Sequence, residues 1–166
     1  MKTIIEGRLI VTEVVDGPFL ASGIFNRKFG GDAPDYGHHL LALYRRHAHH
    51  FLPVGYLNLL PWESVILVGG GCTDGSAFPY MTAEDRQKVT DAGGILYYLL
   101  RYGFEQFADR CEAFYGHVGD PRAEEVDLRA GFVHTGHENL IVNFHRPLAD
   151  SRKAELTAKV LALGPF

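Results

Sequence analysis

The stretch that decides the fold lies in the C-terminal third of the chain and reads Arg122-Ala-Glu-Glu-Val-Asp-Leu-Arg-Ala-Gly-Phe-Val-His-Thr-Gly-His-Glu-Asn-Leu-Ile-Val-Asn-Phe144. Pro121, just before it, suits the first turn of a helix, because its missing N–H would have no partner there. Asp120 can cap the free amide groups of that helix. Gly131 can adopt the left-handed conformation that ends a helix, and Phe132 then anchors the chain in a core. The segment therefore predicts a helix over 121–130 and, after it, two short strands.

Those strands are expected over 133–135 and 140–144, with a turn at Gly136-His137. Working outward, the patterns predict a strand over 3–15, short helical turns over 19–29, meander strands over 39–46, 51–60 and 64–68, a helix start at 82–85, a helix over 95–110, a strand over 113–118 and an amphipathic helix over 151–163. Gly93-Gly94 is expected to separate the two central helices, because paired glycines cost a helix interior about 2 kcal/mol. The fold class is therefore mixed α+β.

Composition narrows the function classes. The chain has 166 residues, 46% of them hydrophobic and 22% charged, which fits one compact domain. A net charge of −4 gives no overall electrostatic attraction to nucleic acid or to an anionic membrane. The N-terminal segment reads as too short and too charged for a signal peptide, and no apolar run reaches about 18 residues. We therefore expect neither a nucleic-acid nor a membrane partner.

The positions of the cysteines and histidines indicate the cellular compartment of the protein and whether it binds a metal. Cys72 and Cys111 show no metal-binding or redox spacing, so two buried free thiols in a reducing cytoplasm are the simplest account. Histidines are dense at 38–39 and 47–50, but neighbouring residues on a strand point to opposite faces and chelate poorly. No metal site is therefore expected.

The order of elements resembles that of the GCN5-related N-acetyltransferases (GNAT), most specifically over residues 112–144. The resemblance implies a central mixed, mostly antiparallel, twisted sheet of about seven strands flanked by helices. It also implies a single GNAT-like domain over 1–166, with a core over about 3–146 and an added C-terminal helix over about 151–163. Acyl-CoA in such domains lies where the fourth and fifth strands splay apart.

Carried onto this chain, the resemblance places acetyl-CoA or a longer acyl-CoA against two segments. The pantetheine arm would lie along Val68, Gly69, Gly70, Gly71, Cys72 and Thr73, and the pyrophosphate on Ala92, Gly93, Gly94 and Ile95. Backbone amides at a helix N-terminus bind phosphate oxygens, and glycines allow close approach. The family's loop pattern is Gln/Arg-x-x-Gly-x-Gly/Ala. Here Val89 stands at the Gln/Arg position and Ala92 at the first glycine.

Four residues are candidates for proton transfer. Many family members place a tyrosine four residues before the Gly-Phe pair to protonate the leaving thiolate, and this chain has Asp127 there. A carboxyl group can take that role only if burial raises its pKa, while a solvated or capping role is the alternative. Glu63, ahead of the fourth strand, and His117, at the end of the fifth, are candidate bases. Tyr115 is a substitute donor or a core residue.

Two functions follow. The first is a CoA-dependent acyltransferase, an N-acetyltransferase or one for longer chains, that acts on an amine or another small-molecule acceptor. Backbone amides near Gly71 and Cys72 would polarise the thioester carbonyl. The second is a GNAT-like module without transfer activity that binds an acyl ligand or a partner, motivated by the altered loop and the missing tyrosine. The tail helix can dock on its own chain or on a second copy, so homodimerisation stays open.

Overall fold

A computed structural model describes residues 1–166. Its strands are β1 (Lys2–Ile5), β2 (Leu9–Val14), β3 (His38–His47), β4 (His50–Trp62), β5 (Val65–Thr73), β6 (Ala113–His117), β7 (Val133–His134) and β8 (Leu140–Asn143). Its helices are α1 (Gly17–Phe29), α2 (Ala83–Asp91), α3 (Ile95–Phe107), α4 (Pro121–Ala130) and α5 (Asp150–Leu163), with 3-10 turns η1 (Gly75–Tyr80) and η2 (Ala108–Arg110).

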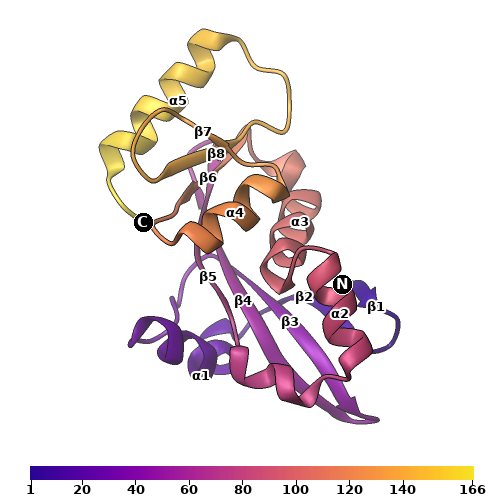
Figure 1. Cartoon of the computed structure of the whole chain (residues 1–166). Coiled ribbons are helices and arrows are strands. Elements are labelled where there is room, and N and C mark those ends of the chain that lie inside the picture. Colours follow the sequence, from indigo (N-terminus) through magenta and orange to yellow (C-terminus); the bar gives the residue numbers. More distant parts are fainter.

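All eight strands form one sheet in the order β1-β2-β3-β4-β5-β6-β8-β7. Every neighbouring pair is antiparallel except β5 and β6, which run parallel (Figure 1). The expected meander of three strands is present as β3, β4 and β5, and the mixed, mostly antiparallel sheet is confirmed. The single parallel pair requires a long crossover, and η1, α2 and α3 supply it.

Helices cover both faces of this sheet. The side chains of Leu40 and Leu59 pack with Leu99 of α3, in a core that also receives residues of α2 and α4. On the other face, Leu41 packs with Ile24 of α1, and farther along the sheet the strands pack against α5. Successive residues of a strand point to opposite faces, so each strand contributes to both layers. We call the two sides the α3 face and the α1 face.

Local signals explain where the helices begin and end. The Asp120 side chain accepts a hydrogen bond from the amide of Arg122, and the Thr82 side chain accepts one from the amide of Asp85, as N-terminal caps do. α2 stops at Asp91, and α3 starts after Gly94. The expected caps at 120 and 82 and the break at Gly93-Gly94 are therefore confirmed.

Three expectations were wrong in detail. The segment 3–15 is a hairpin of β1 and β2, because Gly7 adopts a φ of 64° and turns the chain, so the sheet has eight strands instead of about seven. The segment 17–29 is one continuous helix, capped by Asp16. β4 continues through Trp62, and the turn falls at Glu63, which has a φ of 48°.

α5 docks on its own chain. Leu156 and Val160 are buried on the α1 face against Val65, Leu67 and Tyr115. The segment that follows α5 carries Phe166 back toward the end of β6, where its ring centroid lies 6.1 Å from that of His117. α5 therefore brings a residue of the C-terminal segment to the middle of the sheet.

Candidate active site at the fork between β5 and β6

The two parallel strands separate part-way along the sheet. β5 pairs with β6 from Val65 opposite Ala113 to Val68 opposite Gly116, and β6 then ends at His117 while β5 continues to Thr73. A cavity of about 860 Å³ lies at this fork, and residues of both strands line it. A cavity of this volume is large enough for a cofactor-sized ligand.

The lining part of β5 consists largely of glycine. Tyr56 of β4 pairs with Cys72 and Asn58 pairs with Gly69, so Gly70 and Gly71 together oppose the single residue Leu57. This is a β-bulge, and Gly70 adopts the φ of 60° that such a bulge favours. A Cβ at Gly71 would lie 3.1 Å from side-chain carbons of Leu57 and Leu96. The glycines therefore leave the backbone of β5 open to a ligand.

The N-terminus of α3 also faces the cavity. Gly93, Gly94, Ile95 and Leu96 line it, with φ angles of 109° and 92° at the two glycines. Gly94 caps the helix without any side-chain hydrogen bond, and a Cβ there would have no atom within 4 Å. The first amide groups of a helix have no intrahelical partner and carry the positive end of its dipole. This helix end can therefore accept an anion such as a phosphate group.

Two residues of the expected pyrophosphate loop take other roles. Ala92 ends α2, and its amide bonds to the carbonyl groups of Lys88 and Thr90. It does not line the cavity. Val89, at the position where the family pattern has Gln or Arg, is a core residue with 1% of its surface exposed. Of the four residues expected to receive the pyrophosphate, the structure thus brings Gly93, Gly94 and Ile95 to the cavity.

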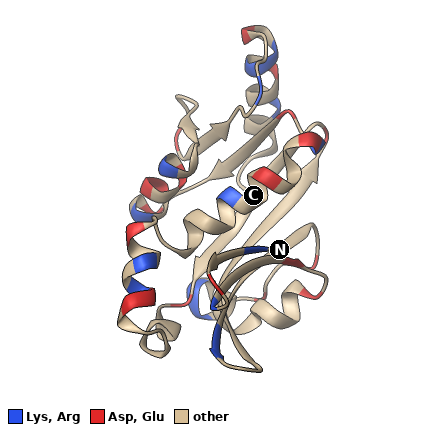
Figure 2. Ribbon diagram, turned by 90° about the vertical axis from the view of Figure 1, so that its right-hand side faces the viewer, with Lys and Arg blue, Asp and Glu red and all other residues tan.

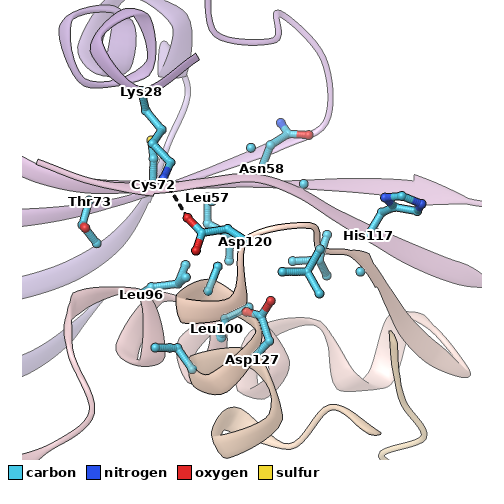
Figure 3. Close-up of a pocket in the computed structure, with 18 of the residues that line it drawn as sticks. Lys28, Leu57, Asn58, Cys72, Thr73, Leu96, Leu100, His117, Asp120 and Asp127 are labelled. Atoms are coloured by element: carbon cyan, nitrogen blue, oxygen red, sulfur yellow. Dashed lines mark hydrogen bonds and ion pairs between the residues drawn. The ribbon is translucent and has the colours of Figure 1, made fainter. Parts of the chain in front are cut away.

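The cavity is continuous from one face of the sheet to the other. Leu57, Leu96 and Leu100 line it on the α3 face, whereas Phe25 and Asn58 line it on the α1 face. In Figure 3, Lys28 and Asn58 lie on one side of the strands, and Leu96, Leu100 and Asp127 lie on the other. The fork is therefore a passage through which groups bound on opposite faces can meet.

Asp127 occupies the α3-face half. It lies on α4 and points toward the cavity, and its carboxyl group has no hydrogen-bond partner (Figure 3). Burial, together with the nearby charge of Glu124, raises the pKa of Asp127 to about 7. A carboxyl group with such a pKa is partly protonated near neutral pH, which a proton donor at this position requires.

His117 occupies the α1-face half, at the last position of β6. Its side chain is exposed and lines the cavity beside Phe166. An imidazole can accept a proton near neutral pH. Asp127 and His117 thus stand on the two sides of the passage.

Glu63 and Tyr115 lie elsewhere. Glu63 precedes the start of β5, whereas the cavity lies toward the end of that strand, roughly 20 Å away at the rise of a β-strand. Its carboxylate instead forms an ion pair of 2.9 Å with Lys159. Tyr115 is fully buried on the α1 face, and its Oη lies 2.9 Å from Oγ1 of Thr157. Neither side chain reaches the cavity.

Cys72 lines the cavity but is poorly suited to attack a carbonyl group. It is 3% exposed, and burial raises the pKa of its thiol to about 11. The thiolate is the nucleophilic form of cysteine, so this thiol is almost entirely unreactive at neutral pH. The aromatic run Tyr97, Tyr98, Tyr102 and Phe104 does not line the cavity and packs on the main core instead.

The sequence reasoning missed several lining residues. They come from α1, from the loop before β3 and from the C-terminal segment: Phe25, Lys28, Phe29, Pro34, Tyr36 and Phe166. The spacing of Phe25 and Phe29, one helical turn apart, was an available signal. Their contribution to the cavity could be recognised only from the packing of α1 on the sheet.

No three His, Cys, Asp or Glu side chains are grouped closely enough to hold a metal ion. None of the helices has the length and apolar character needed to span a bilayer. Figure 2 shows acidic and basic residues interspersed along the outer helices.

Solved structures share this architecture. No family model matches the sequence. No curated protein matches it either. By structure, the chain is similar to Tetrahymena GCN5, with a TM-score of 0.51 and 13% identity over 86% of this chain and 98% of the other. The chain has the GNAT fold. The separation of β5 and β6 beyond Val68 is the divergence of two neighbouring strands that the resemblance implied.

Two further structures support the GNAT fold. A Pyrococcus horikoshii protein assigned as an acetyltransferase has a TM-score of 0.54 and 14% identity, over 80% of this chain and 46% of its own, so this chain spans less than half of its length. A similarly assigned Exiguobacterium protein has a TM-score of 0.50 and 12% identity, over 89% of this chain and 97% of its own. At such identities the GNAT fold is shared, and function has to be argued from the site.

Proposed function

We propose that the protein is a CoA-dependent acyltransferase that transfers an acyl group, an acetyl group or a longer chain, from acyl-CoA to the amine of a small-molecule acceptor. One observation carries the proposal. A single cavity crosses the sheet at the β5–β6 fork, with an uncapped helix N-terminus beside it and the side chains of Asp127 and His117 on opposite faces. The GNAT fold supports the same activity by analogy.

The residues fit acyl-CoA in three respects. Phosphate oxygens find free amide groups at the first residues of α3, Ile95 and Leu96, whereas the Gly94 amide donates to the carbonyl oxygen of Val89 at 2.8 Å. Beyond Val68, β5 has no partner on its β6 side, so the backbone as far as Thr73 can pair with the amides of a pantetheine arm. The apolar side chains of Leu57, Leu96 and Leu100 enclose the space between them. The bound acyl-CoA supplies an activated thioester carbonyl.

In this proposal, groups of the protein on the two faces of the sheet act on different atoms of the reaction. Backbone amides near Gly71 and Cys72 are the candidates to stabilise negative charge on the carbonyl oxygen. His117, on the α1 face, accepts the proton that the attacking amine loses as its nitrogen bonds to the carbonyl carbon. Asp127, on the α3 face, donates a proton to the sulfur as the carbon–sulfur bond breaks. Cys72 stays a neutral thiol, which favours direct transfer over an acyl-enzyme route.

Binding of acyl-CoA is the first test. Calorimetry with CoA, acetyl-CoA and a long-chain acyl-CoA should show saturable binding and rank the chain lengths. Gly94→Asp places a carboxylate on the free amides of α3, and losing hydrogen bonds to a charged group costs about 1.5–3 kcal/mol, so the Kd should rise at least tenfold. Absence of binding to the folded wild-type protein at millimolar acyl-CoA contradicts the proposal.

Gly136→Asp is the matched control. Gly136 also has a positive φ, of 86°, and no atom within 4 Å of its Cβ position, but it lies in the turn between β7 and β8. Both variants therefore introduce the same charge at a glycine with a positive φ. A similar loss of affinity in both would show that strain, not the site, causes the effect.

A second function is favoured by one observation. Val89 is buried where the family pattern supplies a polar phosphate ligand, which reduces the groups available to the pyrophosphate. The protein would then hold an acyl ligand without transferring it. Measured release of free CoA in the presence of an amine panel separates the two, since a binding module releases none.

A further inference from the structure

The α1-face half of the cavity is walled by aromatic rings from three separate segments. Phe25 and Phe29 belong to α1, Tyr36 to the loop before β3, and Phe166 to the segment after α5. The centroids of Phe25 and Phe29 are 4.7 Å apart, and the Phe166 ring stands edge-on to His117. Side chains far apart in the sequence thus converge on the position of the proposed base.

Two of these rings remain open to solvent. Phe29 is 49% exposed and Tyr36 is 54% exposed, although both line the cavity. Large exposed aromatic side chains beside an opening are typical of ligand contact surfaces, because covering them removes apolar area from water. The exposed apolar surface of these two rings is therefore available to contact an acceptor molecule.

A hydrogen bond from β4 holds the loop that carries Tyr36. Nδ2 of Asn58, a residue 3% exposed, donates a hydrogen bond of 2.7 Å to the carbonyl oxygen of Tyr36. His39, buried behind it, contacts the hydroxyl group of Tyr56 at 2.8 Å. A buried polar group that loses its partner is costly, so this contact holds the Tyr36 loop against β4.

Few acidic side chains line the cavity. Besides Asp127, Asp120 is the only side-chain carboxylate among the lining residues. It pairs with Nζ of Lys28 at 3.1 Å and accepts the Arg122 amide at 2.9 Å. A polycationic acceptor such as a polyamine would need several free side-chain carboxylates, and the aromatic wall has none. The aromatic wall therefore offers an acceptor mainly flat, apolar surface.

We propose that the acceptor is an arylalkylamine, an amine on a short chain attached to an aromatic ring. The ring stacks among Phe29, Tyr36 and Phe166, and the amine extends to His117 at the fork. Aromatic pairs gain energy beyond area burial, and a still-protonated amine is attracted to ring faces. This proposal rests on the proposed acyl transfer and specifies its acceptor.

The test compares acceptors by the release of free CoA. With acetyl-CoA saturating, kcat/KM for 2-phenylethylamine should exceed that for spermidine at least tenfold and that for hexylamine severalfold. A preference for spermidine overturns the proposal and leaves acyl transfer standing. Equal rates with 2-phenylethylamine and hexylamine also overturn it, because the ring then contributes nothing.

Variants assign the preference to the wall. Phe29→Ala and Tyr36→Ala should each raise the KM for 2-phenylethylamine about tenfold, or about 1.4 kcal/mol, with kcat and the Kd for acetyl-CoA little changed. Phe19→Ala is the control, since Phe19 lies on the same helix, is 76% exposed and does not line the cavity. An unchanged KM in both cavity variants contradicts the proposal.

Direct binding separates the two proposals. If acetyl-CoA neither binds nor reacts, acyl transfer fails, and calorimetry of 2-phenylethylamine with the protein alone still tests the aromatic wall. Binding that Phe29→Ala weakens and Phe19→Ala does not supports the aromatic site on its own. Absence of such binding in that case rejects both.

Discussion

Replacing Asp127 by asparagine is expected to stabilise the folded protein at alkaline pH while lowering its transfer activity. The wild-type carboxyl group has no hydrogen-bond partner, and burial raises its pKa to about 7. Asparagine has nearly the same shape and carries no charge at any pH. The substitution therefore removes one titrating group from the cavity and changes little else.

The sign follows from proton linkage. Below about pH 3 the carboxyl group is protonated in both the folded and the unfolded state, so it contributes nothing to the difference. As the pH rises from about 4 to about 7, the unfolded chain releases the proton and the folded chain retains it, so wild-type stability falls. Above about pH 8 both states are ionised and the penalty is constant.

The magnitude has a ceiling set by the two pKa values. A group that titrates at about 7 when folded and at about 4 when unfolded lowers the free energy of unfolding by at most about 4 kcal/mol at pH 8 and above. The carboxyl group faces a cavity that solvent enters, so screening reduces the penalty, and we expect about 2 kcal/mol. The Asp127→Asn variant should gain this amount over wild type at pH 8.5 and almost nothing at pH 4.

Urea unfolding of both proteins at pH 4, 5.5, 7 and 8.5 measures the difference directly, because all other titrating groups cancel between them. Asp32→Asn is the control, since Asp32 is exposed and its side chain has no ion pair or hydrogen bond. An Asp127→Asn advantage that does not grow with pH would refute a raised pKa. An unchanged kcat would refute the donor role even if the stability result holds.

Three other predictions concern β5 and the core. Cys72 should resist iodoacetamide at pH 8 in the folded protein and react after unfolding, because burial raises the pKa of its thiol to about 11. Gly69→Val should leave the urea midpoint unchanged, since the nearest atom to its Cβ position is 3.8 Å away, but lower kcat/KM more than tenfold by filling the passage. Asp85→Ala should lower the free energy of unfolding by about 2–3 kcal/mol in the same assay, because the buried carboxylate accepts hydrogen bonds from Tyr44 Oη at 2.7 Å and Arg8 at 3.0 Å.

Local chemistry made much of the fold predictable. Asp120 and Gly131 bound α4 because capping and the left-handed turn are decided within a few residues. The hairpin at Gly7 was missed because Ile, Val and Thr on both sides read as one continuous strand, and only the glycine between them signalled a turn. Such a turn is weighed correctly only when the pairing of the two halves is known.

The site was predictable where backbone alone defines it. Gly69 to Gly71 and Gly93-Gly94 stand out in the sequence because they lack side chains, and all five line the cavity. Side chains were harder to place. Glu63 is adjacent to β5 in the chain but lies at the opposite end of the strand, and Phe166 reaches the fork only because α5 packs on the α1 face. The raised pKa of Asp127 depends on packing around α4 that no local pattern reports.

Several features that each lower the stability of the fold lie around one cavity. Glycine in a strand interior weakens the strand, yet three occupy the middle strand β5. α1, α2 and α4 have side-chain caps, whereas α3 begins uncapped beside the cavity, and α5, the other uncapped helix, begins at the exposed Asp150. Asp127 adds a partly buried carboxyl group whose pKa is raised to about 7. Each feature lowers stability on its own, and sequences keep such departures chiefly where function uses them. Their convergence on the fork is the reason to seek the chemistry there.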